Sequence, residues 1–219
     1  NEKFQNFVSQ VAEMALVSDA ADMDAFMEEK WVEDNSKSLK EALVEQIAVI
    51  GEKLSIRRFT KVEATEGAVV SYVHGGGRIG VIVESKTNVV NDAIKEAMSN
   101  VAMQVAALNP QYVSRDEVSA EFIEHEKEII KAQIMNDPKE SQKPEKVIDG
   151  MINGRINKQL KDICLMDQVY VKAEDGKQTV AAYVAQVAKE QNADFAIKSV
   201  VRFETGEGIE KKEENFAEE

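Results

Sequence analysis

The sequence predicts an α+β fold in which two related subdomains carry antiparallel sheets packed by helices, with an antiparallel helical hairpin (a coiled-coil arm) inserted in the second. Residues 4–50 repeat apolar side chains at helical spacing. Residues 56–83 and 195–204 are rich in β-branched side chains between turn residues, which predicts strands. Residues 119–166 combine high charge with narrow apolar stripes, which predicts the arm. We expect core subdomains at 1–67 and at 68–118 with 167–205, the arm at 119–166, and an acidic C-terminal module or tail at 206–219.

The first third of the chain is predicted to be helical. Phe4–Leu16 has the spacing of an amphipathic helix, and a short helix is expected over Met23–Val32. A third helix is expected over Ser38–Ile50, because its first four residues, Ser-Leu-Lys-Glu, have the pattern of a capping box. Gly51 stands where a glycine commonly ends a helix.

Three strands joined by tight turns are predicted next, at Ile56–Ala64, Ala68–Val73 and Arg78–Glu84. The short turns between them favour an antiparallel meander. A long helix is then expected over Val89–Leu108, and Asn109-Pro110 should end it, because proline cannot continue a helix.

Two charged helices joined by a polar loop make up the predicted arm. The first is expected over Ser119–Asn136, and Pro144 suits the first position of the return helix. A helical hairpin of this kind packs its apolar stripes between the two helices. The residues that we assign to this stripe are Ile129, Ile130, Ile134, Val147, Met151 and Ile156.

The β pattern returns after the arm. A strand is expected at Val169–Lys172, a helix at Thr179–Glu190 and a last strand at Phe195–Glu204. Ile56–Phe59 and Val200–Phe203 end in the same Arg-Phe pair, and each follows a predicted helix. This internal similarity favours two related subdomains.

Charge and composition exclude several classes of function. The formal net charge of -13 disfavours binding to the phosphate backbone of nucleic acids and favours a protein partner with basic patches. No apolar run approaches the roughly 20 residues needed to cross a bilayer. Cys164 is the only cysteine, which rules out an internal disulfide and a paired-cysteine metal or redox site. We therefore expect neither a nucleic-acid nor a membrane partner.

No catalytic or cofactor-binding pattern stands out in the sequence. Gly75, Gly77 and Gly80 fit the G-x-G-x-x-G spacing of dinucleotide-binding loops. That motif must open a helix, whereas the residues after these glycines are predicted to continue as a strand, so a hairpin turn is the alternative. His125 is predicted to be a solvated arm residue and Cys164 a packed one. We expect no enzymatic activity, no metal and no cofactor.

Several stretches, in order along the chain, resemble the elongation factor Ts family. They are Ile50–Arg58 (IGEKLSIRR), Ser71–Val81 (SYVHGGGRIGV), Val105–Pro110 (VAALNP), Val118–Glu121 (VSAE) and Arg202–Lys211 (RFETGEGIEK). The resemblance implies a cytoplasmic guanine-nucleotide exchange factor of translation elongation, which binds elongation factor Tu and carries out no covalent chemistry. It also implies a core of two subdomains, a dimerisation arm and a short C-terminal module.

The same resemblance implies roles for particular residues. Ile50 and Gly51 would contact the nucleotide-binding domain of Tu, and His74 would be a further contact. Tyr170 and Val171 would meet the third domain of Tu. All of these assignments except Val171 have a structural alternative: Ile50 as a core residue, Gly51 as a helix cap, His74 as a polar residue at a strand end and Tyr170 as a core aromatic. Some family members self-associate through the arm, so a homodimer is the alternative to an arm that only closes on itself.

The resemblance also implies two features that this sequence lacks. Family members carry a small ubiquitin-associated-like helical domain and a threonine-aspartate-phenylalanine-valine motif, both of which would precede Asn1. The phenylalanine of that motif wedges into Tu, so we expect the present residues to supply docking surfaces without the wedge. The alternative function is a non-enzymatic coiled-coil adaptor or dimerisation protein without exchange activity, which would need the arm but not the motif at Ile50–Gly51.

Overall fold

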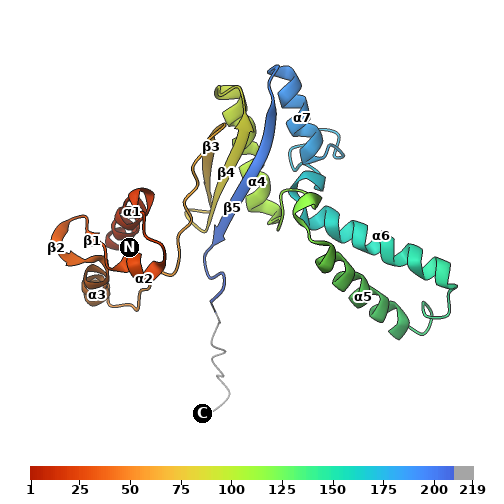
Figure 1. Ribbon diagram of the computed structural model, residues 1–219, viewed down its shortest axis with the longest axis horizontal. Coiled ribbons are helices and arrows are strands. Elements are labelled where there is room, and N and C mark those ends of the chain that lie inside the picture. Colours follow the sequence, from red (N-terminus) through yellow and green to blue (C-terminus); the bar gives the residue numbers. More distant parts are fainter. Residues whose placement is uncertain (210–219) are drawn as a thin grey trace, which may run out of the picture. The chain divides into compact units, whose positions relative to one another are not determined.

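The computed structural model describes residues 1–209, which divide into two compact units, Asn1–Lys61 and a second unit that begins at Val62 (Figure 1). Each unit combines helices with one small antiparallel sheet. The α+β class predicted from the sequence is therefore confirmed. Within the described residues, no helix is both long enough and apolar enough to cross a membrane.

The first unit packs three helices against a short β-hairpin. Its elements are α1 (Glu2–Val17), α2 (Met23–Met27), β1 (Lys30–Trp31), β2 (Asp34–Ser38) and α3 (Leu39–Ile50). Aromatic side chains dominate the core: the ring centroids of Phe26 and Phe59 lie 4.7 Å apart, and those of Phe7 and Trp31 lie 5.3 Å apart. The other buried members of this core are Met14, Ala15, Leu39 and Ala42.

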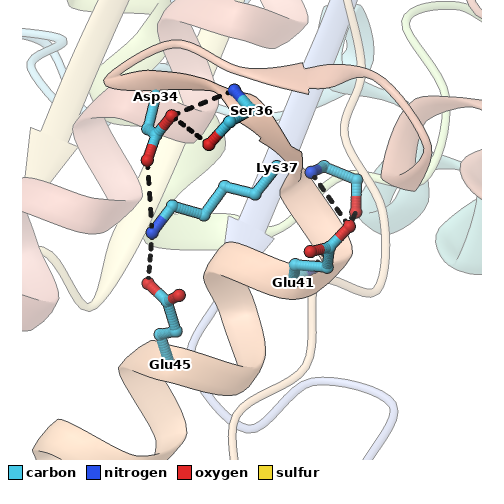
Figure 2. A network of polar contacts seen from close by, with 6 residues as sticks. Asp34, Ser36, Lys37, Glu41 and Glu45 are labelled. Atoms are coloured by element: carbon cyan, nitrogen blue, oxygen red, sulfur yellow. Dashed lines mark hydrogen bonds and ion pairs between the residues drawn. The ribbon is translucent and has the colours of Figure 1, made fainter.

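A polar network joins the hairpin to α3 (Figure 2). The Nζ atom of Lys37 donates to Glu45 at 2.7 Å and forms an ion pair with Asp34 at 3.7 Å. The hydrogen bond to Glu45 raises the pKa of Lys37, and the hydrogen bonds from Ser36 lower the pKa of Asp34. The network therefore links the strand that precedes α3 to the middle of that helix.

Both predicted ends of α3 are confirmed. The Ser38 side chain accepts from the backbone N–H of Glu41, and the Glu41 carboxylate accepts from the backbone N–H of Ser38, which completes the capping box. Gly51 caps the C-terminus with a φ of 80°, a left-handed conformation that glycine adopts without steric cost. Ile50 is consequently the last helical residue.

The second unit is built on a three-stranded antiparallel sheet with the order β3-β4-β5. Its strands are β3 (Val69–His74), β4 (Ile79–Thr87) and β5 (Phe195–Glu204). Helix α4 (Asp92–Leu108) packs on β3 and β4, and α7 (Val180–Glu190) packs on β5. The buried apolar core of this region includes Val81, Val83, Ile94, Met98, Val101, Val105, Leu165, Tyr170, Val180, Val184 and Ile197.

The arm leaves the second unit between α4 and α7. After the 3-10 turn η1 (Arg115–Glu117), α5 (Ala120–Asn136) and α6 (Glu145–Ile163) pack on each other and extend away from the sheet (Figure 1). The turn η2 (Leu165–Asp167) closes the insertion. A separate aliphatic core holds the two helices together, with Ile130, Ile134, Ile148, Ile152, Ile156 and Leu160 buried. The helical hairpin is confirmed, whereas its coiled-coil character stays a prediction.

The predicted strand Ile56–Ala64 is wrong, because residues 52–64 belong to neither sheet. Ile56 and Phe59 instead pack against the aromatic core of the first unit. The third strand of the larger sheet is β5, which pairs with β4 from Ile79↔Glu204 to Thr87↔Phe195. The predicted three-strand meander is therefore a hairpin completed by a strand from far along the chain.

Smaller differences have local causes. The helix predicted over Met23–Val32 ends at Met27, because Trp31 pairs with Asp34 in the β1–β2 hairpin and buries its ring. Pro144 is the N-cap of α6 rather than its first helical residue. The relation between the subdomains loses its main support, since only the second Arg-Phe pair lies in a strand. Most of the predicted acidic tail, from residue 210, lies outside the described residues.

Val169–Lys172 was also predicted to be a strand, and it forms none. Its only ladder contact is an isolated antiparallel bridge between Val169 and Thr179. Hydrogen bonds nevertheless hold the segment on both of its sides, and Val171 and Lys172 form a turn in which the Ala173 N–H donates to the Tyr170 carbonyl at 3.0 Å.

Candidate functional site

The first candidate contact is the C-terminal end of α3. Ile50 is half-buried, and Gly51 is exposed with its N–H donating to the Ile47 carbonyl at 2.9 Å. A Cβ atom added at Gly51 would meet nothing within 4 Å. The requirement for glycine therefore comes from the left-handed backbone conformation, and the space around the helix end is open within the first unit. Open space suits a partner contact, but it does not distinguish this role from simple capping.

The second candidate contact is His74, at the end of β3. Gly75, Gly76 and Gly77 form the turn after it with φ values of 63°, 68° and 103°, and β4 then continues through Gly80. The hairpin-turn interpretation of these glycines is confirmed, and no helix begins here to hold a pyrophosphate. The dinucleotide-binding alternative is removed.

The Tyr72 hydroxyl lies 2.8 Å from Nδ1 of the exposed His74 ring. When Tyr72 donates in this bond, Nδ1 of His74 accepts, and the ring proton sits on Nε2. His74 then offers a partner one N–H donor at the tip of a rigid hairpin. Sequence reasoning missed Tyr72, although its place two residues before His74 on a predicted strand puts both side chains on one face.

The third candidate contact is the stretch Val169–Val171, which we call the 169–171 segment. Tyr170 is only 5% exposed and stacks on Tyr183, with ring centroids 4.2 Å apart and planes inclined by 12°. Burial, together with the neighbouring Tyr183, raises the pKa of Tyr170. Val169 and Val171 are 49% and 50% exposed. The structure thus favours the core role for Tyr170 and leaves Val171 as the exposed candidate, joined by Val169, which sequence reasoning missed.

A fully buried glutamine holds this segment. Gln104 of α4 accepts from the Val171 N–H at 2.8 Å through Oε1, and its Nε2 donates to the Val169 carbonyl at 3.1 Å. The same Nε2 also donates to Oε1 of the buried Gln168 at 3.2 Å. Gln168 in turn donates to the Asp162 carbonyl at 2.7 Å. The sequence offered one signal for Gln104, namely a polar residue on the apolar stripe of a helix.

The predicted arm residues divide into two groups. Ile130, Ile134 and Ile156 are buried between α5 and α6, and Met151 packs partly against them. Ile129 and Val147 are exposed. The buried members close the hairpin on itself. Self-association through the exposed members stays a prediction.

The described part of the chain offers little chemistry beyond binding. Its His, Cys, Asp and Glu side chains form no group of three that could hold a metal ion. Cys164 is buried at the C-terminal end of α6, and burial raises the pKa of its thiol, which keeps it in the unreactive protonated form. His125 lies exposed on α5. The candidate contacts are therefore donors, apolar side chains and backbone ends rather than reactive groups.

Comparison of the sequence with known proteins identifies the family to which the chain is similar. The family model described as "Elongation factor TS" matches residues 1–207. Elongation factor Ts of Clostridioides difficile (strain 630) is 48% identical over 219 residues, which are 100% of this chain and 69% of the relative. Elongation factor Ts of Clostridium botulinum (strain 657 / Type Ba4) is 42% identical with the same coverage, and that of Clostridium kluyveri is 42% identical over 70% of its length. The chain belongs to the elongation factor Ts family.

Proposed function

We propose that the chain is a guanine-nucleotide exchange factor for elongation factor Tu. The observation that carries the proposal is the family match over residues 1–207, which includes every candidate contact described above. The geometry is compatible with it, because Gly51, His74 and Val171 all lie at the surface of their own units. The net charge of -13 would speed the encounter with a basic face of the partner.

The proposed mechanism is binding linkage rather than catalysis of a covalent step. An exchange factor must bind nucleotide-free Tu more tightly than nucleotide-bound Tu, and linkage then requires that bound Tu hold GDP more weakly by the same factor. In this proposal, contacts from Ile50–Gly51 and His74 are best satisfied when the phosphate and magnesium site of Tu is deformed. Val171 would supply docking energy that does not depend on the nucleotide.

The experiment is rapid mixing of Tu loaded with fluorescent GDP against excess unlabelled GDP and increasing concentrations of this chain. We expect the release rate to rise to a plateau, which yields a half-saturating concentration and a maximal rate. Higher ionic strength should raise the half-saturating concentration, because surface charges are screened. Unaccelerated release at every concentration of the chain would overturn the proposal.

The adaptor alternative predicts a different pair of results. An adaptor would form a complex with its partner, detectable by sedimentation, while the rate of GDP release from Tu stayed unchanged. Measuring complex formation and release in the same samples therefore separates the two functions.

A further inference from the structure

The Gln104 side chain takes the place of a neighbouring strand beside the 169–171 segment. In a parallel ladder, one residue of a strand bonds the carbonyl of residue i and the N–H of residue i+2 on its neighbour. The carboxamide of Gln104 makes this same pair of bonds, to the Val169 carbonyl at 3.1 Å and from the Val171 N–H at 2.8 Å. We call this arrangement the amide clamp.

The other edge of the segment is paired with main chain. The Tyr170 N–H donates to the Gln178 carbonyl at 2.8 Å, and Val169 forms its bridge with Thr179. The segment is therefore paired on both edges although it belongs to no sheet, and a turn begins at Val171. Tyr170 is buried in the core, whereas its two neighbours, Val169 and Val171, are exposed.

The clamp is fully satisfied, which is what a buried carboxamide requires. Gln104 is 0% exposed, and both of its Nε2 hydrogens have acceptors, in the Val169 carbonyl and in Oε1 of Gln168. Replacing only one half of such a group leaves buried partners without hydrogen bonds. Position 104 should therefore tolerate fewer substitutions than the apolar positions beside it on α4.

Gln168 connects the clamp to the base of the arm. Its Nε2 donates to the carbonyl of Asp162 in the last turn of α6, at 2.7 Å. The neighbouring Asp167 pairs with Arg115 at 2.7 Å across the start of the arm. The chain that leaves the arm is therefore tied to α4 immediately before the 169–171 segment.

We propose that Gln104 is a positioning residue for partner docking: its amide clamp presents Val169 and Val171 as one apolar face, and Gln168 fixes that face relative to the arm. The inference rests on the proposed function, which already assigns Val171 to the docking surface for elongation factor Tu, and it adds Val169 to that surface. Gln104 itself is buried and touches no partner. A glutamine with a purely structural role would change stability without changing docking.

The test uses three variants of the full chain. Gln104→Met removes the clamp while roughly keeping its volume. Gln104→Glu keeps an acceptor for the Val171 N–H but removes both N–H donors. Gln10→Met is the matched control, because the Gln10 side chain donates to Glu33 at 2.8 Å at the exposed surface of the first unit. Each variant is measured in the GDP-release assay and by amide hydrogen exchange.

We expect both Gln104 variants to raise the half-saturating concentration about tenfold while the maximal release rate stays near that of the unaltered chain. Hydrogen exchange at the Val171 amide should accelerate, whereas the amide of Val83 in β4 should stay protected. Gln10→Met should match the unaltered chain in every measurement.

The pH profile of Gln104→Glu adds a readout that a structural role would not give. Burial raises the pKa of a carboxyl group, so lowering the pH from about 8 to about 6 should protonate the introduced side chain in part. A protonated carboxyl can donate again to Val169 or Gln168. The docking defect relative to the unaltered chain should therefore shrink as the pH falls.

The outcomes separate the two proposals. A faster Val171 amide with an unchanged half-saturating concentration would overturn the docking role of the clamp. An unchanged Val171 amide would overturn the clamp itself. If Gln104→Met does not fold, Gln104→Glu decides: a pH-independent docking defect counts against the proposal and a pH-dependent one supports it. If the unaltered chain releases no GDP from Tu, the proposed function fails, and the docking role that rests on it fails too, while hydrogen exchange still decides whether the clamp exists.

Discussion

The end of α3 and the 169–171 segment are both predicted to contact the same partner, yet different kinds of interaction hold them in place. The α3 end is determined locally. The capping box at Ser38 sets where the helix starts, and the left-handed Gly51 sets where it stops. The 169–171 segment has no regular element of its own, and its position depends on Gln104 and Gln178, which approach from other parts of the chain.

This difference predicts two patterns of sensitivity. A locally determined surface should respond mainly to changes in its own backbone and caps, with modest effects on the remainder of the unit. A surface held by buried polar groups should respond to changes far away in sequence, because each partner left unpaired in the interior costs free energy. Substitutions at the two surfaces can therefore test whether each is a docking element or only a part of the fold.

The largest effect is expected from Val171→Asp. Val171 is half-exposed, so the folded chain should tolerate a carboxylate there with little change in its unfolding free energy. Docking would remove that charge from water against an apolar surface, which is costly without a paired cation. We expect the half-saturating concentration for GDP release from Tu to rise about a hundredfold.

Val90→Asp is the matched control for this prediction. Val90 is 52% exposed and precedes α4, away from the 169–171 segment in sequence. The control should dock like the unaltered chain. Equal defects in the two variants would show that added negative charge, rather than the position of Val171, weakens docking. The 169–171 segment would then not be a docking surface for Tu.

A smaller effect concerns the buried side of the same segment. Burial and the nearby Tyr183 raise the pKa of Tyr170, so folding favours the neutral phenol. Stability from a raised pKa is complete below the unfolded pKa of about 10 and is lost as the pH rises above it. We expect this tyrosine to lower the unfolding free energy by at most about 1.4 kcal/mol per pH unit above about pH 10.

Urea unfolding of the unaltered chain and of Tyr170→Phe, from about pH 9 to about pH 11, measures this loss. The difference between the two free energies isolates Tyr170 from other groups that titrate in the same range. Tyr72→Phe, which removes a hydroxyl bonded to His74 at the surface, is the control. Parallel pH profiles for the unaltered chain and Tyr170→Phe would contradict the burial that separates Tyr170 from its exposed neighbours.

The contrast between local and distant determinants also explains what the sequence could predict. The capping box, the glycine cap and the glycine turn each depend on a few adjacent residues, so their patterns were sufficient. The apolar stripes of the arm likewise predicted a hairpin, because each helix supplies the surface that the other buries. Two of the motifs that predicted the family, Ile50–Arg58 and Ser71–Val81, include the glycine cap and the glycine turn.

The failures share the opposite cause. Ile56–Ala64 has the composition of a strand, but Ile56 and Phe59 pack against the aromatic core of the first unit, and pairing partners cannot be known from composition. Val169–Lys172 has the composition of a strand, but its last two residues form a turn and its neighbour on one edge is the side chain of Gln104. The role of Tyr170 as a partner contact stays a prediction, and its burial against Tyr183, which favours the core alternative, depends on residues distant in the sequence.

The smallest effect is expected at the α3 end, from Gly51→Ala. The left-handed conformation at Gly51, with a φ of 80°, costs a residue with a Cβ atom about 1 kcal/mol. No atom lies within 4 Å of the added methyl group, so the cost should come from the backbone alone. We expect unfolding of the first unit to become easier by this amount and GDP release to slow only about twofold, as the last turn of α3 frays and Ile50 shifts.

Two companion variants make this result interpretable. Gly51→Asn should recover part of the loss, because asparagine tolerates the left-handed region better than alanine does. Gly154→Ala introduces the same methyl group within α6, where the helical backbone is ordinary, and should stabilise the arm by about 0.5–1 kcal/mol. A different result would contradict the role of Gly51 as a cap. If Gly51→Ala slowed GDP release about as strongly as Val171→Asp weakens docking, and the first unit kept its stability, Gly51 would be a close-approach contact to Tu.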